Sequence, residues 1–367
     1  MKRFNYADEK ISGIELMIAI PSVLIGVGIL TLPKSLAQDT IAGDGWIFIV
    51  AGGILTMLIA WCIAKIATLF PGKPFVEFTS MVATKPVAIV LTLVFTVTGL
   101  LVSSYQVRSI ADIAQKYLFD RTPPEIIALT FLLVVVYAVS GTRVGILRLN
   151  MLFFPIILFI TLVVLAFSVG SIEVGHFQPM FQTSVNGYWS GLKAGIESYS
   201  GLAILWFYSM LLRKPEKAPK MALIGTAIPM LIYLLLFIVT IGVFGNSVTA
   251  NLVYPTVELA KSVEIPGEFF ERFESLFFTI WIMAIFNTTA VMMDIMVFSF
   301  TSVFKKVPKQ RVLFIAAPIL FFIAMLPKNV VTFNKYVTIL VEFTVINNLF
   351  LIVLLFSLSK IRGAKIK

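Results

Sequence analysis

The sequence predicts an all-α integral membrane protein with ten transmembrane helices. Of its 367 residues, 59% are hydrophobic and only 13% are charged, whereas a soluble domain is about half apolar and about a quarter charged. The apolar residues form continuous runs rather than the alternating pattern of a β-barrel. Taking about 20 apolar residues per span, we expect spans near 12–37, 44–70, 87–117, 124–141, 147–170, 190–212, 218–244, 268–303, 311–327 and 334–359.

The basic residues predict the orientation of the chain. Most of the 29 Lys and Arg residues lie in the terminal segments and in alternate loops, for example Lys65, Arg148 and Lys214. Because basic residues accumulate on the cytoplasmic side of a membrane, both termini are predicted to be cytoplasmic. This positive-inside bias explains the net charge of +10 without nucleic acid, so we expect the lipid bilayer as a partner and no nucleic-acid partner.

The first span is interrupted near its middle, at Ile25-Gly26-Val27-Gly28 and at Pro33. In a helix interior, Gly costs roughly 1 kcal/mol and Pro roughly 3 kcal/mol relative to Ala. In hydrocarbon, the backbone groups released by such a break must also find new partners. We therefore predict that the break lines a cavity, with Ser22, Gly26, Val27 and Gly28 at a substrate site. The alternative is that the small residues permit close helix packing.

Ten spans divide into two halves of five, over 1–170 and 190–359, within one transmembrane domain over 1–367. Because five is odd, the second half enters the membrane from the opposite face, as in an inverted repeat. The sixth span has a corresponding break at Glu197-Ser198-Tyr199-Ser200-Gly201. Paired breaks point to a substrate site near the midplane. The longest outer segment, 245–272, is predicted to form short helices over the outer face.

Local patterns predict how two helices begin. Ser12-Gly13-Ile14-Glu15 fits a capping box, so we expect Glu15 to cap the first helix rather than act at a site. Thr122-Pro123-Pro124 is typical of a helix start, with Pro in the first turn.

The third span carries Tyr105, Arg108 and Asp112, whose spacing places them on one helical face. Arg108 and Asp112 are four residues apart and can pair with each other. The sequence allows two interpretations of this face. The face could line the pocket, with Tyr105 near the substrate and Arg108 and Asp112 as an outer gate, or the two charges could form a self-satisfied pair near the interface.

Polar residues also lie within the eighth and tenth spans. Charged groups at bilayer depth are costly and usually pair or line a pathway. Asp294 and Glu342 are therefore candidates for ion or proton coupling. Asn287 and Thr288 are predicted to shape the pocket, with interhelical hydrogen bonding as the alternative. Asn347 and Asn348 are further polar residues of the tenth span.

Enzymatic and metal sites are not indicated. The chain has one His, His176, and one Cys, Cys62, and it lacks HExxH, GxSxG and Walker-type motifs. We therefore predict no enzyme activity, no cofactor and no metal site.

Several motifs together resemble the B subunits of Ger-type spore germinant receptors, the endospore germination permease family of the amino acid–polyamine–organocation superfamily. They are the run from Ile25 to Lys34, Arg108 followed by Arg121-Thr122-Pro123, Tyr254-Pro255-Thr256, and Glu271-Arg272-Phe273-Glu274-Ser275 ahead of Trp281. The resemblance implies a LeuT-like fold with discontinuous first and sixth helices. It also implies residence in the spore inner membrane and A-type and C-type (lipoprotein) partner subunits.

The resemblance further implies recognition of a small nutrient, commonly an amino acid, that triggers germination. The nutrient carboxylate would meet backbone N–H groups after Val27 and Gly28, and its ammonium would lie near Ser198, Tyr199 and Ser200. The family often has Gly-x-Glu where this chain has Gly201-Leu202-Ala203, so Glu197 is the available carboxylate. Some proton-coupled relatives carry a lysine in the fifth helix, and the run over 149–170 has none.

Two alternative functions use the same pocket. The chain could be a secondary transporter that moves an amino acid together with H⁺ or Na⁺. It could also be a ligand-gated channel for ions or water.

Overall fold

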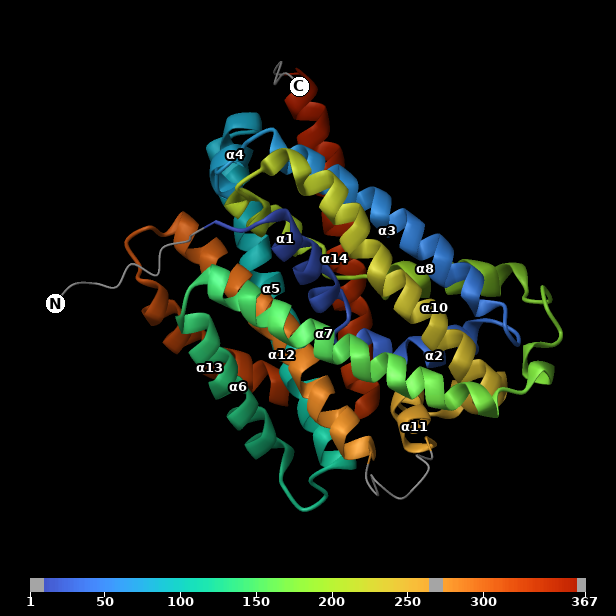
Figure 1. Cartoon of the computed structure of the whole chain (residues 1–367). Coiled ribbons are helices and arrows are strands. Elements are labelled where there is room, and N and C mark those ends of the chain that lie inside the picture. The colour runs from blue at the N-terminus through green and yellow to red at the C-terminus, as the bar shows by residue number, and fades with distance from the viewer. Residues whose placement is uncertain (1–9, 264–272, 362–367) are drawn as a thin grey trace.

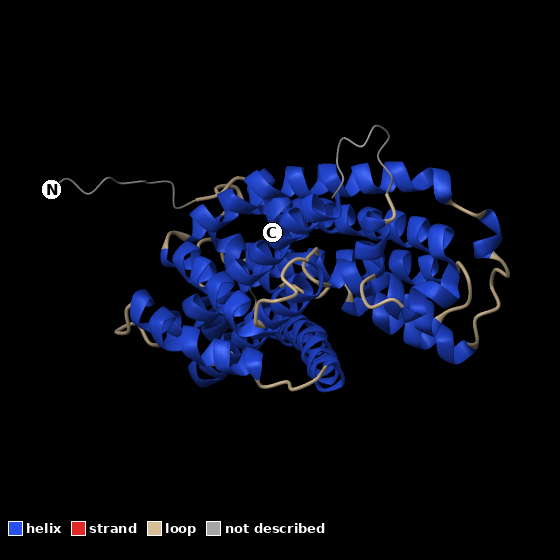
Figure 2. Ribbon diagram, turned by 90° about the horizontal axis from the view of Figure 1, so that it is seen from below, coloured by secondary structure: helices blue, strands red, loops and turns tan. Residues whose placement is uncertain are grey.

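The computed structural model describes residues 10–263 and 273–361, and this part of the chain is helical apart from loops and one isolated bridge between Ile11 and Leu212 (Figures 1 and 2). The α-helices are α1 (Gly13–Leu24), α2 (Gly28–Asp39), α3 (Gly45–Thr68), α4 (Phe75–Val82), α5 (Lys85–Tyr117), α6 (Pro124–Ser140), α7 (Arg143–Ser168), α8 (Val185–Glu197), α9 (Ala203–Tyr208), α10 (Ala218–Asn251), α11 (Pro255–Lys261), α12 (Phe273–Val303), α13 (Lys309–Met325) and α14 (Val330–Ile361). Short 3₁₀ turns occur at Val169–Ser171, Val174–Phe177, Ser209–Leu211 and Pro215–Lys217.

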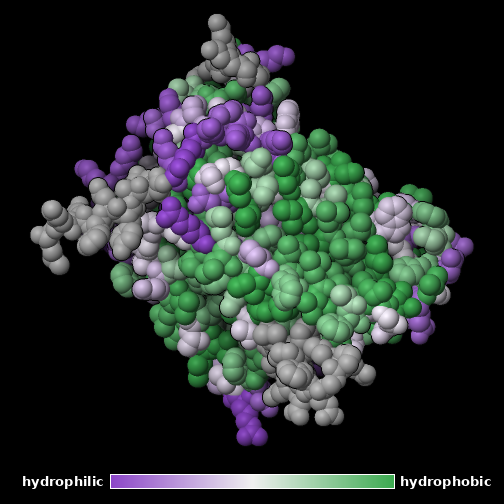
Figure 3. All heavy atoms as spheres, in the orientation of Figure 1, coloured by the Kyte–Doolittle hydropathy of each residue, from purple (hydrophilic) through white to green (hydrophobic). Residues whose placement is uncertain are grey.

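The described helices make this an integral membrane protein. Six of them, α3, α5, α7, α10, α12 and α14, are long and apolar enough to cross a bilayer. α1 and α2, bent by 54° at their break, are together long and apolar enough to form a broken span or a re-entrant loop. A broad apolar band covers the visible face between more polar regions (Figure 3). Each of the ten predicted segments contains a helix or a helix pair. That all ten cross the membrane stays a prediction, because α6, α13 and the pair α8 and α9 are shorter.

The long helices pair across the two predicted halves. The most extensive contacts join α5 to α12 and α3 to α10, and α3 and α10 run side by side in Figure 1. The backbones of α3 and α8 also touch, since a β-carbon on Gly52 would lie 2.6 Å from the carbonyl carbon of Gly195. These contacts hold the two interrupted segments between the long helices.

Local sequence explains the helix starts. Ser12 accepts a hydrogen bond from the backbone N–H of Glu15 at 3.2 Å, and the Glu15 carboxylate accepts one from the Ser12 N–H at 2.6 Å. The predicted capping box is therefore confirmed. α6 begins at Pro124, with Pro in its first turn as predicted.

The predicted outer segment over 245–272 is helical in part. α10 continues to Asn251 through a kink at Gly245, whose φ of 73° favours glycine, and α11 follows. Residues 264–272 lie outside the described residues, as do the side chains of 273–276. Of the predicted motif from Glu271 to Ser275, the structure therefore describes only the backbone of Phe273, Glu274 and Ser275.

Candidate functional site

Two interrupted helix pairs meet near the centre of the fold. Residues 25–27 separate α1 from α2, and residues 198–202 separate α8 from α9. Gly201 has a φ of 136°, which a residue with a side chain rarely adopts. The breaks adjoin, because a β-carbon on Gly28 would lie 3.7 Å from the Ser198 carbonyl oxygen. Both predicted interruptions are thus present.

Tyr233 on α10 ties the two breaks together. Its buried hydroxyl donates a hydrogen bond to the Leu24 carbonyl at 2.8 Å, and the Ser198 carbonyl lies 3.5 Å away. Both carbonyls lie where a helix ends, so they have no partner in the next turn. Sequence reasoning missed Tyr233, because a single tyrosine within an apolar span does not reveal what it contacts.

A cavity of about 380 Å³ lies at these breaks. Its wall comes from α2, α5, α8, α12, α14 and the segments around the breaks. Nine of the twelve residues predicted to bind substrate line it: Gly26, Val27, Gly28, Tyr105, Glu197, Ser198, Ser200, Gly201 and Thr288. That they bind a ligand stays a prediction.

The other three predicted binding residues lie outside this wall. The Ser22 hydroxyl donates to the Ile18 carbonyl within its own helix at 2.9 Å. The Tyr199 side chain does not line the cavity, and its hydroxyl donates a hydrogen bond to the Ile49 carbonyl on α3 at 2.9 Å. Asn287 is fully buried, and neither polar atom of its amide has a partner within the described residues. Helical spacing alone did not distinguish these orientations.

Arg108 and Asp112 pair with each other, with Nε and a carboxylate oxygen 2.9 Å apart. Neither residue lines the cavity. The local pair that helical spacing allows is therefore present, and a role of this pair as a gate stays a prediction. Tyr105, on the same helix, does line the cavity, and its ring stacks on Phe333 of α14.

Asp294 also lies outside the cavity wall, in a buried ion pair with Arg143 of α7. Arg143 Nε lies 2.8 Å from the carboxylate, and the Tyr208 hydroxyl donates to the same oxygen at 2.6 Å. The guanidinium also donates to the Phe207 carbonyl at 3.2 Å and packs 3.8 Å from the centre of the Phe298 ring. This cluster joins α7, α9 and α12.

Glu342 of α14 forms an ion pair with Lys193 of α8. Lys193 Nζ also lies 3.9 Å from Glu197, which lines the cavity together with Asp39. None of the described residues that line the cavity is Lys, Arg or His. The cavity wall therefore carries two carboxylates and no cationic side chain.

Several polar residues of the wall were not predicted to belong to the site. They include Gln38, Asp39, Gln106, Thr338, Asn347 and Asn348. The Asn pair was visible in the sequence as polar residues within a span. Gln106 lies one position after Tyr105, and no pattern in the sequence indicated its orientation. Within the described residues, no group of His, Cys, Asp or Glu is arranged to hold a metal.

Comparison with protein families matches residues 10–332 to a family model described as "Spore germination protein". The spore germination protein GerLB of Bacillus cereus is 38% identical over 342 residues, covering 93% of this chain and 91% of the relative. The chain belongs to this spore germination protein family. Spore germination protein B2 of Bacillus subtilis is 27% identical, with 91% of each chain covered.

The predicted resemblance to Ger-type germination permease B subunits is confirmed by these matches. Membership in this family places the chain among receptor- or permease-like proteins rather than enzymes.

Solved transporter structures share the fold of this germination protein. Mhp1, a nucleobase-cation-symport-1 family transporter with bromovinylhydantoin bound, aligns with a TM-score of 0.68 at 13% identity, covering 91% of this chain and 76% of Mhp1. MhsT in complex with L-phenylalanine aligns with a TM-score of 0.68 at 15% identity, covering 93% of this chain and 88% of MhsT. At these identities the likeness shows the fold alone.

Proposed function

We propose that this chain is the transporter-like subunit of a spore nutrient-germinant receptor. It binds a small nutrient, such as an amino acid, at the two helix breaks, and binding triggers germination. The observation that carries the proposal is a cavity at paired helix breaks in a member of the spore germination family. We place the receptor in the spore inner membrane, with an A-type subunit and a C-type lipoprotein as partners.

The geometry of the breaks suits a zwitterion. The N-terminus of α2 lies beside the cavity at Gly28, where unpaired N–H groups and the helix dipole favour an anion. Glu197 and the C-terminal end of α8 line the same cavity and favour a cation. The nutrient carboxylate therefore binds near Val27 and Gly28, and its ammonium binds near Glu197 and Ser198.

Binding then acts by shifting a conformational equilibrium. The receptor exchanges between an open arrangement and a closed one, in which the two breaks lie closest. A ligand that contacts both interrupted segments binds the closed arrangement more tightly. It shifts the population toward that arrangement by the difference between its two affinities. Partner subunits that contact the interrupted helices would respond to this change in population.

A substitution at Gly28 tests the cavity assignment. Gly28→Trp fills the space at the break, so spores carrying it should not respond to nutrient. Gly28→Ala is the matched control, because its β-carbon would meet the Ser198 carbonyl at an ordinary contact distance of 3.7 Å. The measurement is the fall in optical density of spore suspensions exposed to each of the common amino acids, with protein level followed by immunoblot. A full response from the Trp variant would exclude this cavity as the nutrient site.

The transporter fold of the structural neighbours favours a second candidate, an ion- or proton-coupled amino acid transporter. Liposomes that contain this chain alone separate the two functions. Accumulation of a radiolabelled amino acid driven by an H⁺ or Na⁺ gradient would favour transport, whereas binding without accumulation favours the receptor.

A further inference from the structure

Most hydroxyl groups in the wall of the cavity present hydrogen-bond acceptors to a ligand. Six Ser and Thr side chains of the wall each donate their hydrogen to a backbone carbonyl three or four positions earlier in the chain, at 2.7 to 3.3 Å: Thr31, Ser35, Thr98, Ser198, Thr338 and Thr344. A hydroxyl has one hydrogen to donate and two lone pairs. These six groups therefore have only lone pairs left for a ligand.

The side-chain amides of the wall show the same bias. Gln38 Nε2 donates to the Ala250 carbonyl at 3.0 Å, and Asn348 Nδ2 donates to the Thr344 carbonyl at 2.8 Å. Gln106 is only 2% exposed, and its buried Oε1 atom has no partner among the described residues. Buried polar atoms usually have a partner, because leaving one unpaired costs free energy. The partner that Oε1 lacks is a donor, which a ligand in the cavity can supply.

Asp39, the last residue of α2, adds a carboxylate to this wall of acceptors. It is partly buried, and no hydrogen bond or ion pair joins its side chain to another described residue. Lys193, whose charge also reaches Asp39, is paired with Glu342 and lies 3.9 Å from Glu197. Three carboxylates thus share one ammonium group. The C-terminal end of α2 lies at the same place, and its dipole also favours a cation.

Asp39 lies on the same face of α2 as the break. Gly28, Thr31, Ser35 and Asp39 all line the cavity, and their spacing of three or four residues places them on one side of the helix. At 1.5 Å per residue, the distance from Gly28 to Asp39 along the helix axis is about 16 Å. Helical side chains lean toward the N-terminus, so the Asp39 carboxylate reaches back toward the break. A nutrient held at the break can extend a long side chain toward it.

We infer that the nutrient carries a second cationic group on its side chain and that Asp39 binds this group. The cavity then selects basic amino acids, such as lysine, arginine or ornithine, over neutral amino acids of similar length. This inference rests on the proposed function and names its substrate class. The carboxylate and ammonium of the nutrient keep the positions proposed at Gly28 and Glu197. The acceptors along α2 suit the several N–H donors of an ammonium or a guanidinium.

The test compares matched pairs of ligands. The full-length purified chain in nanodiscs is screened by thermal shift against the common amino acids and then titrated by calorimetry with lysine against norleucine and arginine against citrulline. Each pair differs in side-chain charge and hardly in length. Wild type should bind at least one basic member about 10-fold or more tightly than its neutral counterpart, as expected for a hydrogen bond between charged groups. Asp39→Asn should remove most of this preference, with little change for the neutral members, whereas a merely structural effect would weaken both members alike.

Asp120→Asn is the matched control, because Asp120 is exposed, lies outside the cavity wall and loses the same charge. It should leave the preference unchanged. Wild type that binds the neutral members as tightly as the basic ones would overturn this inference and leave the proposed function standing, and that comparison needs no variant. An unchanged preference in Asp39→Asn would overturn the assignment to Asp39. Failure of every amino acid to bind the wild type would overturn the proposed function itself.

Discussion

At the scale of single residues, Arg143 and Asp294 form the most enclosed ion pair described. The Asp294 side chain is 1% exposed, and the arginine also contacts a carbonyl and two aromatic rings. Removing one member of a buried pair leaves an uncompensated charge, which costs about 3–5 kcal/mol. We therefore expect Arg143→Met or Asp294→Leu to lower the unfolding free energy by about this amount, measured by denaturant unfolding in detergent.

Two comparisons make this expectation specific. The double variant Arg143→Met/Asp294→Leu leaves no unpaired charge and should recover much of the lost stability. Arg148→Gln is the matched control, because Arg148 is over half exposed and lies 3.8 Å from Glu15, a geometry worth about 0–1 kcal/mol. Equal losses in the single and double variants would contradict a role for the charge pair.

Residue-scale prediction succeeded where the partners are neighbours in sequence. The capping box of Ser12 and Glu15 and the pair of Arg108 and Asp112 follow from helical spacing. Arg143 and Asp294 are 151 positions apart, and nothing in a single sequence encodes their proximity. For the same reason, Gln106 and Tyr233 could not be assigned to the site in advance.

At the scale of helices, small residues set how closely α3 and α8 approach. A β-carbon on Gly195 would lie 2.3 Å from the Phe48 carbonyl oxygen, and one on Gly52 would lie 2.6 Å from backbone atoms of Gly195. Neither neighbour is a flexible side chain, so the helices must separate. We expect Gly195→Ala to lower stability by about 1–3 kcal/mol and to weaken amino acid binding, because α8 carries Glu197.

Thermal unfolding and ligand titration of the purified variants measure both effects. Gly170→Ala is the matched control, since a β-carbon there would meet no atom within 4 Å. A Gly195→Ala protein as stable as the control would show that α3 and α8 do not need this close contact.

Helix positions were largely predictable, because long apolar runs in a bilayer leave few alternatives to a helix. The two breaks were predictable because glycine and proline are costly within a span. The short helices α4 and α11 were harder to delimit, since they lack a long apolar run and depend on contacts with distant segments. How the two breaks face each other likewise depends on contacts between segments that are distant in sequence, so it could not be predicted from the sequence.

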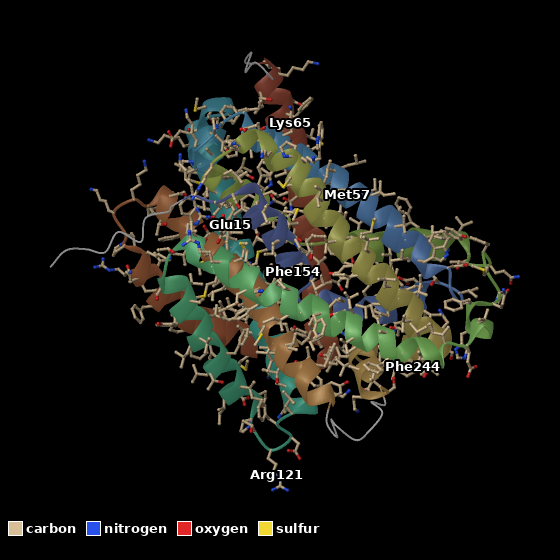
Figure 4. All side chains as sticks on the ribbon, viewed as in Figure 1. Glu15, Met57, Lys65, Arg121, Phe154 and Phe244 are labelled. Carbon is tan, nitrogen blue, oxygen red and sulfur yellow. The ribbon has the colours of Figure 1, made fainter. Side chains whose placement is uncertain are left out.

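At the scale of the whole molecule, the distribution of charge predicts how the chain lies in the membrane. Lys65 and Arg121 lie at opposite ends of the molecule in Figure 4. Lys214 follows α9, and the sequence predicts it on the same side as Lys65. An excess of basic residues on one side predicts that side to be cytoplasmic. Three predicted spans precede Arg121, so with a cytoplasmic N-terminus the loop at Arg121 should face outward.

Thiol labelling in whole cells tests this orientation. Single cysteines at the exposed positions 121 and 214, introduced as Arg121→Cys and Lys214→Cys in a Cys62→Ala background, should differ in their access to a membrane-impermeant maleimide. The Arg121 variant should be labelled in intact cells, and the Lys214 variant only after the membrane is permeabilised. The reverse pattern would contradict the predicted orientation. Three predicted spans, 124–141, 147–170 and 190–212, lie between the two positions. An odd number of crossings places their ends on opposite sides, so labelling of both variants in intact cells would contradict it.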